Sequence, residues 1–296
     1  MKHILSFGGG VDSTTLLAIH FNREKSAELL GVSLERLDEM FPVSLDAAVF
    51  SDPGAEFDST YENVRHAQNK GNDFGLAVHN IHLTIKGERR TITQWLAHNG
   101  AVPLMPGGCH TCSVKFKGDV MKVWAEKLYP EDDITWYIGI EANETKRAKR
   151  FQGAKGERHT SRYPLIELGL TREACESLLK GLEWGVPVHK SSCVFCPWMT
   201  EEELRDMYFN HPEKWAMAKK VEHDFSVTSP RKYKAFIDGG SKVNAGGRAL
   251  PGTWKYDSWN DKGARLFCRV KKGQKKRTIQ EWEDKFSLER NNGNGQ

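Results

Sequence analysis

Glycines, hydroxyl groups and one carboxylate gather near the start of the chain, in Ser6-Phe7-Gly8-Gly9-Gly10-Val11-Asp12-Ser13-Thr14-Thr15. Three successive glycines allow positive φ angles and let the backbone approach a ligand without a clash from Cβ. A helical pattern starts directly after them. The first N–H groups of a helix have no partner within the helix and attract anions, and the three hydroxyls add donors. The stretch therefore predicts a phosphate-binding loop, with a ligand-free glycine turn as the alternative.

Two Cys-x-x-Cys pairs are the second set of residues suited to chemistry: Cys109 with Cys112, and Cys193 with Cys196. In an intracellular protein this spacing is typical of metal binding or catalysis rather than of disulfides. Four thiolates suit either tetrahedral zinc or a [4Fe–4S] cluster. We therefore expect one site that all four cysteines share, and the spacing leaves both metals open.

Alternating helical and strand patterns supply the elements that must position these residues. Apolar stretches over 3–5, 46–50, 78–83 and 134–140 predict strands, and helical patterns lie between them. The segment of about 22–42 has apolar residues at three- and four-residue steps, which indicates a helical insertion before the second strand.

The glycine loop is not a Walker loop, because no Gly-Lys-Ser/Thr follows it, and it lacks the G-x-G-x-x-G spacing. It resembles the S-G-G-x-D-S loop of the PP-loop ATP pyrophosphatases and the PAPS reductase family; residues 9–13 match, and Gly8 stands where serine is more common. The resemblance implies that an adenine nucleotide, ATP or PAPS/APS, binds here with Mg2+, and that Asp12 helps to orient the metal. The implied nucleotide-binding residues are Ser6, Gly8, Gly9, Gly10, Val11, Asp12, Ser13 and Thr14.

Two later segments are also similar to motifs of this family. Asp52-Pro53-Gly54-Ala55-Glu56 is similar to D-T-G-x-E, with proline in place of threonine, and implies that Asp52 and Glu56 face the nucleotide. A plain turn is the alternative. The segment from Gly139 to Arg147 is similar to G-I-x-x-x-E-x-x-R and implies that Gly139 and Glu144 line the site while Lys146 and Arg147 offset developing charge. On the residues alone, Glu144 and Arg147 are equally typical of a surface i,i+3 pair.

The second cysteine pair is similar to the cluster cysteines of iron–sulfur sulfonucleotide reductases. Those enzymes have adjacent cysteines in the first pair, whereas this chain has Cys109-x-x-Cys112, so zinc stays an alternative to [4Fe–4S]. They also carry a C-terminal Glu-Cys-Gly-[IL]-His nucleophile. Nothing after Cys196 matches that motif, and Cys268 has neither glycine nor histidine beside it.

The resemblance spans about residues 1–225 and implies an α/β fold: an open parallel sheet with helices on both faces and the nucleotide at the carboxyl ends of the strands. Residues 226–296 form a separate glycine- and aromatic-containing extension. From residue 228 onward, Lys and Arg number 16 against 7 Asp and Glu, a surplus of +9 in a chain of net charge +4. Such a segment suits a nucleic-acid acceptor, although a solvated surface is the simpler interpretation.

No apolar run approaches the roughly 18–20 residues of a membrane span, and the first residues show no signal-peptide pattern. We expect a cytoplasmic protein that does not contact membranes; the sequence gives no oligomeric state.

Three functions follow. The first is a PAPS reductase-like PP-loop enzyme that cleaves its nucleotide at the α-phosphate, adenylates an acceptor and supports sulfur transfer. The second is a sulfonucleotide (PAPS/APS) reductase. The third is a non-catalytic nucleotide- and nucleic-acid-binding module with structural zinc.

Overall fold

The computed structural model describes residues 1–99, 103, 112–148, 158–238, 267 and 277–293. These residues belong to two compact units. The first comprises residues 1–52, 56–83 and 117–192, and the second comprises residues 53–55, 84–116 and 193–296. Each unit is described separately.

A five-stranded parallel sheet forms the centre of the first unit, with strand order β3-β2-β1-β6-β7. The strands are β1 (Lys2–Ser6), β2 (Ala47–Asp52), β3 (Val78–His82), β6 (Ile134–Ile138) and β7 (His159–Arg162). The chain adds β2 and β3 on one side of β1 and then β6 and β7 on the other. The order therefore reverses at β1, and ligands bind at such a reversal, beyond the carboxyl ends of the strands.

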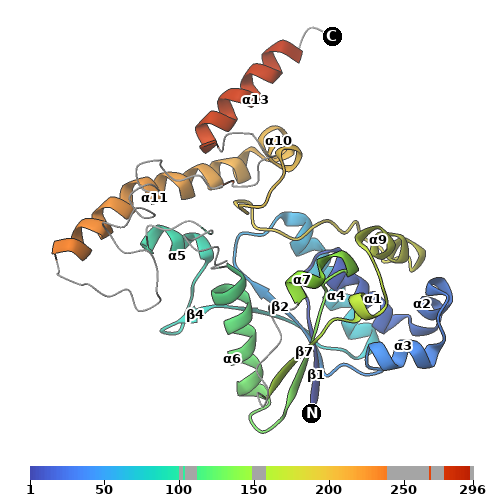
Figure 1. Ribbon diagram of the computed structural model, residues 1–296. Helices are drawn as coiled ribbons and strands as arrows, with labels where there is room; N and C mark the ends of the chain where they lie inside the picture. Colours follow the sequence, from blue (N-terminus) through green and yellow to red (C-terminus); the bar gives the residue numbers. More distant parts are fainter. Residues whose placement is uncertain (100–102, 104–111, 149–157, 239–266, 268–276, 294–296) are drawn as a thin grey trace. The chain divides into compact units, whose positions relative to one another are not determined.

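Helices cover both faces of this sheet. They are α1 (Val11–Phe21), α2 (Arg23–Leu30), α3 (Leu34–Met40), α4 (Asp58–Phe74), α6 (Asp119–Leu128), α7 (Thr145–Ala148), α8 (Pro164–Glu167) and α9 (Arg172–Gly181), with a 3-10 turn at Ala142–Glu144. The predicted α/β class, with an open parallel sheet between helices, is confirmed (Figure 1). The region of 22–42, predicted to be helical, contains α2 and α3.

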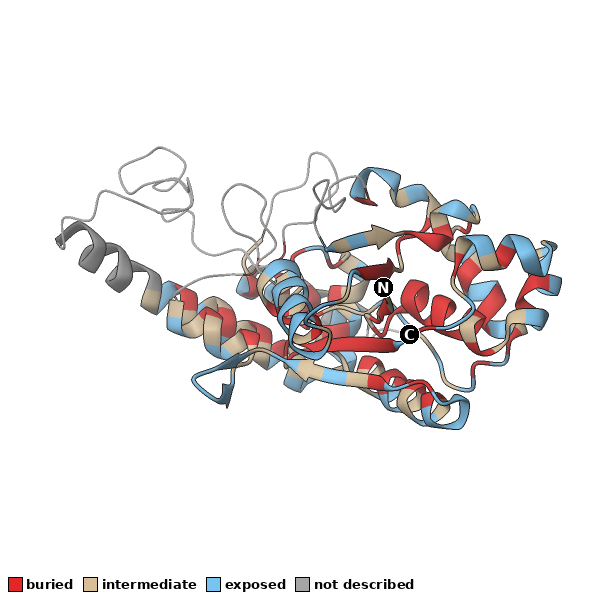
Figure 2. Cartoon of the chain, turned by 90° about the horizontal axis from the view of Figure 1, so that it is seen from below, coloured by how far each residue is buried: buried red, intermediate tan, exposed pale blue. Residues whose placement is uncertain are grey.

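Alternating residues of each strand explain the two layers, because successive side chains of a strand point to opposite faces. Leu5 and Phe50 pack in one core cluster with residues of α1, α4 and α9. Ile4 and Val49, their neighbours in the chain, pack in a second cluster with Ala125 of α6. Figure 2 shows the buried residues in red along these strands and along α1. The result is a rigid base beneath the carboxyl end of β1.

The second unit is mainly helical. It contains a short hairpin of β4 (Thr84–Ile85) and β5 (Glu88–Arg89), then α5 (Ile92–Asn99), α10 (Glu201–Asn210), α11 (Pro212–Asp238) and α13 (Ile279–Gly293). A π-helix, Cys112–Gly118, begins in this unit and ends in the first. We place the start of the C-terminal extension at residue 226, which lies within helix α11. That boundary stays a prediction.

Aromatic side chains form the core of the second unit. Trp215, Trp282 and Phe286 are almost fully buried, and Tyr208 of α10 shares a 2.8 Å hydrogen bond with Ser287 of α13. Trp282 and Phe286, two aromatic residues of the predicted extension, therefore pack inside the protein, whereas Trp254, Tyr256 and Trp259 lie outside the described residues.

Charged residues of α13 also make contacts within the second unit. Arg205 of α10 bonds to Glu289 of α13 at 3.0 Å, and Lys285 of α13 pairs with Glu201.

No helix in the described part of the chain combines the length and apolarity needed to cross a bilayer.

Candidate functional site

The glycine loop joins the carboxyl end of β1 to the first turn of α1, at the point where the strand order reverses. Gly9 has φ +71°, a left-handed conformation that favours glycine. Gly10 is the N-cap of α1, and no side chain caps the helix there. The first N–H groups of α1 therefore remain available to an anion at the loop.

The hydroxyls near the loop make hydrogen bonds to other groups of the protein. Ser13 Oγ accepts from the Gly8 N–H at 3.0 Å and donates to the Gly10 carbonyl at 3.2 Å. Thr14 is fully buried, and Thr15 Oγ1 donates to the Val11 carbonyl. These hydroxyls make hydrogen bonds within the protein in this conformation, and their role as donors to a phosphate stays a prediction. Backbone N–H groups are the donors that the loop offers.

Asn63 of α4, which the sequence analysis missed, fixes the loop from beneath. Its Nδ2 donates to the Gly9 carbonyl at 3.0 Å and to Thr14 Oγ1 at 2.8 Å. Its Oδ1 accepts from Trp184 Nε1 at 2.8 Å. Asn63 is fully buried, so this polar group lies where an unmade hydrogen bond is costly. The network joins residues up to 175 positions apart in the chain, and no local spacing predicts it.

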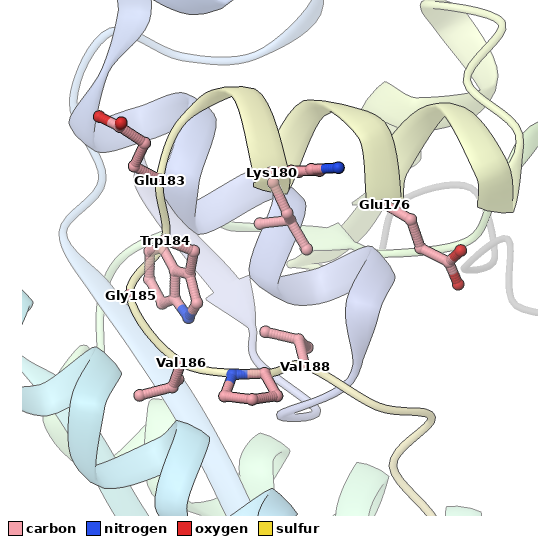
Figure 3. Close-up of a pocket in the computed structure, with 9 residues that line it drawn as sticks. Glu176, Lys180, Glu183, Trp184, Gly185, Val186 and Val188 are labelled. Carbon is pink, nitrogen blue, oxygen red and sulfur yellow. The ribbon is translucent and has the colours of Figure 1, made fainter.

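Trp184 also lies beside a pocket of about 400 Å³ between α9 and the loop of residues 183–188. Figure 3 shows Glu176 and Lys180 on α9, with Trp184, Val186 and Val188 on the loop below. The lining contains none of the predicted site residues. The loop of residues 183–188 is linked to the glycine loop through Trp184, which donates to Asn63.

Replacing Trp184 with phenylalanine is expected to weaken nucleotide binding by about tenfold, because it leaves Asn63 Oδ1 buried without its donor. Calorimetric titration with ATP and Mg2+ measures the change. Trp215→Phe is the matched control, since the indole N–H of Trp215 has no hydrogen-bond partner among the described residues. Equal affinities of the two variants would contradict a role for the Asn63 network.

Asp12, in the first turn of α1, is the most unusual charged group of the site. Its side chain is only 10% exposed, and Oδ2 pairs with Arg172 of α9 at 3.0 Å. Oδ1 is buried with no partner in the described part of the chain. Burial raises the pKa of Asp12 to about 6, and the Arg172 guanidinium opposes that rise. Perturbed carboxylates of this kind are common at functional sites.

Gly139, directly after β6, lies against the same turn of α1. A Cβ on Gly139 would come within 2.6 Å of the Ser13 backbone nitrogen and 2.8 Å of the Asp12 carbonyl carbon. Only glycine fits this approach. The structure thus brings together Gly139 and the glycine loop, which the sequence analysis assigns to one site.

The other predicted residues lie as follows. Ser6 ends β1, and its hydroxyl contacts Met121 Sδ at 3.6 Å. Glu144 and Arg147 form an ion pair of 2.9 Å, and Lys146 is exposed on α7. The Glu144–Arg147 contact is the surface pair that we state as an alternative; it leaves their proposed roles untested.

The predicted carboxylates after β2 both have protein partners. Asp52 Oδ1 accepts from the Tyr61 hydroxyl at 2.9 Å. Glu56 is buried and pairs with Lys117 at 3.0 Å. Both partners come from helical segments outside the D-T-G-x-E-like segment.

Three of the four proposed metal ligands are described, and Cys109 lies outside the described residues. Cys193 and Cys196 flank a tight turn in which the Cys196 N–H donates to the Cys193 carbonyl at 2.9 Å. Cys112 begins the π-helix. The three described cysteines belong to the second unit, and a set of four thiolates fits zinc or an iron–sulfur cluster. Within the described residues, no three His, Cys, Asp or Glu side chains are grouped to bind a metal ion.

Comparison with known protein families and with curated proteins finds no match to this chain.

Proposed function

We propose that this chain is a PP-loop enzyme of the PAPS reductase-like group, which binds ATP or a related adenine nucleotide and cleaves it at the α-phosphate. An acceptor oxygen would attack the α-phosphorus, the bond from that phosphorus to the bridging oxygen would break, and pyrophosphate would leave. Nitrogen or sulfur would then displace AMP from the adenylated acceptor. A nucleic acid bound by the basic segment of 226–296 is our candidate acceptor.

Asp12 carries the proposal. A buried carboxylate oxygen without a partner costs about 1–3 kcal/mol, and Asp12 has one at the N-terminus of α1, beside three glycines. A nucleotide phosphate with its Mg2+ would supply both the anion that the helix N-terminus attracts and a cation for Asp12 Oδ1, since only Oδ2 is paired with Arg172. The S-G-G-x-D-S resemblance adds adenine to this otherwise general phosphate site.

The proposed roles follow from these positions. Backbone N–H groups of Val11, Asp12 and Ser13 would hold the pyrophosphate portion, and Asp12 would help to orient Mg2+, which neutralises phosphate charge. Lys146 or Arg147 would offset the charge that develops on the leaving group, the usual main contribution to catalysis of such transfers. Arg147 would first have to leave Glu144.

Cys109, Cys112, Cys193 and Cys196 would hold a [4Fe–4S] cluster or, alternatively, Zn2+. A cluster would supply redox or sulfur chemistry, and zinc would stabilise the fold. The cysteine constellation also favours a second candidate function, a sulfonucleotide reductase acting on PAPS or APS. That candidate requires a thiol nucleophile, and Cys268 lies outside the described residues.

Product analysis of the full-length protein tests the proposal. Incubation with ATP, Mg2+ and RNA or DNA, followed by anion-exchange chromatography, is expected to yield pyrophosphate together with AMP or adenylated nucleic acid. ADP and phosphate would place cleavage at the wrong bond. In a parallel incubation with PAPS and a dithiol as the two-electron reductant, release of sulfite would favour the reductase. Nucleotide binding without any product would indicate the non-catalytic module. Iron, zinc and sulfide measured on the same anaerobic sample identify the metal.

A further inference from the structure

Ser191 lies unusually close to the glycine loop. A Cβ built on Gly10 would be 2.8 Å from Ser191 Oγ and 2.9 Å from the Ser191 backbone nitrogen. Gly10 has φ −98°, which other residues adopt readily. Gly10 must therefore be glycine because of the approach of Ser191, and not because of its own backbone conformation.

The donors of Ser191 are not used by the protein. In the described part of the chain, neither its N–H nor its hydroxyl has a hydrogen-bond partner. The residue is half-buried, so a ligand or water can reach it. The nearby Ser13 hydroxyl, by contrast, is already bonded to Gly8 and Gly10.

Gly8 gives this arrangement its significance. The loop that the sequence resembles has serine at this position, and this chain lacks that hydroxyl. A Cβ on Gly8 would lie 3.7 Å from Ser191 Oγ, so the Ser191 hydroxyl occupies the neighbourhood that a serine at position 8 would reach. The buried Oδ1 of Asp12, in the first turn of α1 directly after the loop, is a second polar atom without a partner in the described part of the chain.

We propose that Ser191 is a phosphate-binding residue, and that its hydroxyl replaces the one that the glycine loop lacks at Gly8. The ligand is a phosphate group of a nucleoside polyphosphate, bound between the Ser191 donors and the first N–H groups of α1. This inference rests on the proposed function and assigns a new residue to the same site. It also explains why a segment 181 positions from Gly10 is held against the loop.

The steric data make the inference testable by exchange of the hydroxyl. At Gly8 the nearest atoms to a new Cβ are Ser13 Oγ at 3.6 Å and Ser191 Oγ at 3.7 Å, which are ordinary contacts. Gly8 does not have a positive φ. A serine therefore fits at position 8, whereas position 10 admits no side chain.

Ser191→Ala is expected to raise the dissociation constant for ATP with Mg2+ by about tenfold, the effect of losing one hydrogen bond to a charged group. Adding Gly8→Ser to that variant is expected to restore most of the affinity. Ser192→Ala is the matched control and should bind as the wild type does. Calorimetric titration gives the affinities, and melting temperatures confirm that all variants fold.

Each outcome has one meaning. If the wild-type protein binds ATP and Ser191→Ala binds it equally well, the inference is wrong and the proposed function is unaffected. If affinity falls but Gly8→Ser restores none of it in a folded double variant, the Ser191 hydroxyl does not replace the one that is missing at Gly8, and that part of the inference is wrong. If the wild-type protein binds no nucleoside polyphosphate, the proposed function fails, and this inference fails with it.

Discussion

Replacing Asp12 with asparagine is expected to lower nucleotide-dependent pyrophosphate release by ~10²-fold or more, the usual effect of removing one preorganised charged group from a transfer site. The amide keeps the shape of the side chain but removes the charge that would orient Mg2+. The rate is measured with saturating ATP so that weaker binding does not account for it. Asp46→Asn is the control, because Asp46 pairs with Lys2 and precedes β2, at the opposite end of the strand from Asp52.

The same substitution is expected to stabilise the fold at neutral pH. The folded-state pKa of Asp12 is raised from 3.8 to about 6 by burial. The native state therefore binds more protons than the unfolded state between these values, and stability falls as pH rises through this window. A shift of this size corresponds to about 3 kcal/mol. The asparagine variant does not lose this stability as the pH rises, because its amide does not titrate.

Urea denaturation in metal-free buffer at pH 4 and pH 7.5 measures this effect, provided that unfolding is reversible. The wild type should lose more stability than Asp12→Asn between the two pH values. An identical pH dependence in both proteins would mean that Asp12 titrates normally, and would remove the electrostatic basis of the proposed site. A less active but more stable variant is the pattern expected of a strained functional group.

The second large effect is expected from Gly139→Ala, which should abolish measurable nucleotide binding. The new Cβ would lie within 2.6–2.9 Å of backbone atoms of Asp12 and Ser13. Because backbone atoms cannot move aside as a flexible side chain does, the first turn of α1 must shift. Overpacking of this kind costs about 1–3 kcal/mol of stability, and the displaced N–H groups no longer meet the phosphate.

Loss of stability alone must be separated from loss of the site. Gly169→Ala provides the control, because Gly169 has φ +69° with no atom near its missing Cβ. Alanine there costs about 1–2 kcal/mol through backbone strain. If this variant binds ATP normally and Gly139→Ala does not, the effect belongs to the α1 turn. Normal ATP binding by Gly139→Ala would show that the ligand lies elsewhere.

Local patterns in the sequence determined much of this protein. The alternation of apolar stretches and helical patterns predicted the α/β class. Strands of a parallel sheet are covered by helices on both faces, so they appear in the sequence as apolar runs separated by helical patterns. The run of three glycines located the loop, since tight turns between a strand and a helix depend on backbone freedom that glycine provides. Asp12 and Gly139 were assigned through the resemblance of their segments to motifs of the PP-loop family.

Tertiary structure alone decided what surrounds the loop. Asn63, Arg172, Trp184 and Ser191 come from segments about 50 to 180 positions away and have no common spacing. The tertiary structure also places the hydroxyl of Thr14 in the interior, because the first turn of α1 is packed against α4. Contacts of this kind depend on how helices pack on the sheet, and local propensity carries no information about that packing. The sequence therefore locates the glycine loop, while the fold supplies the residues that surround it.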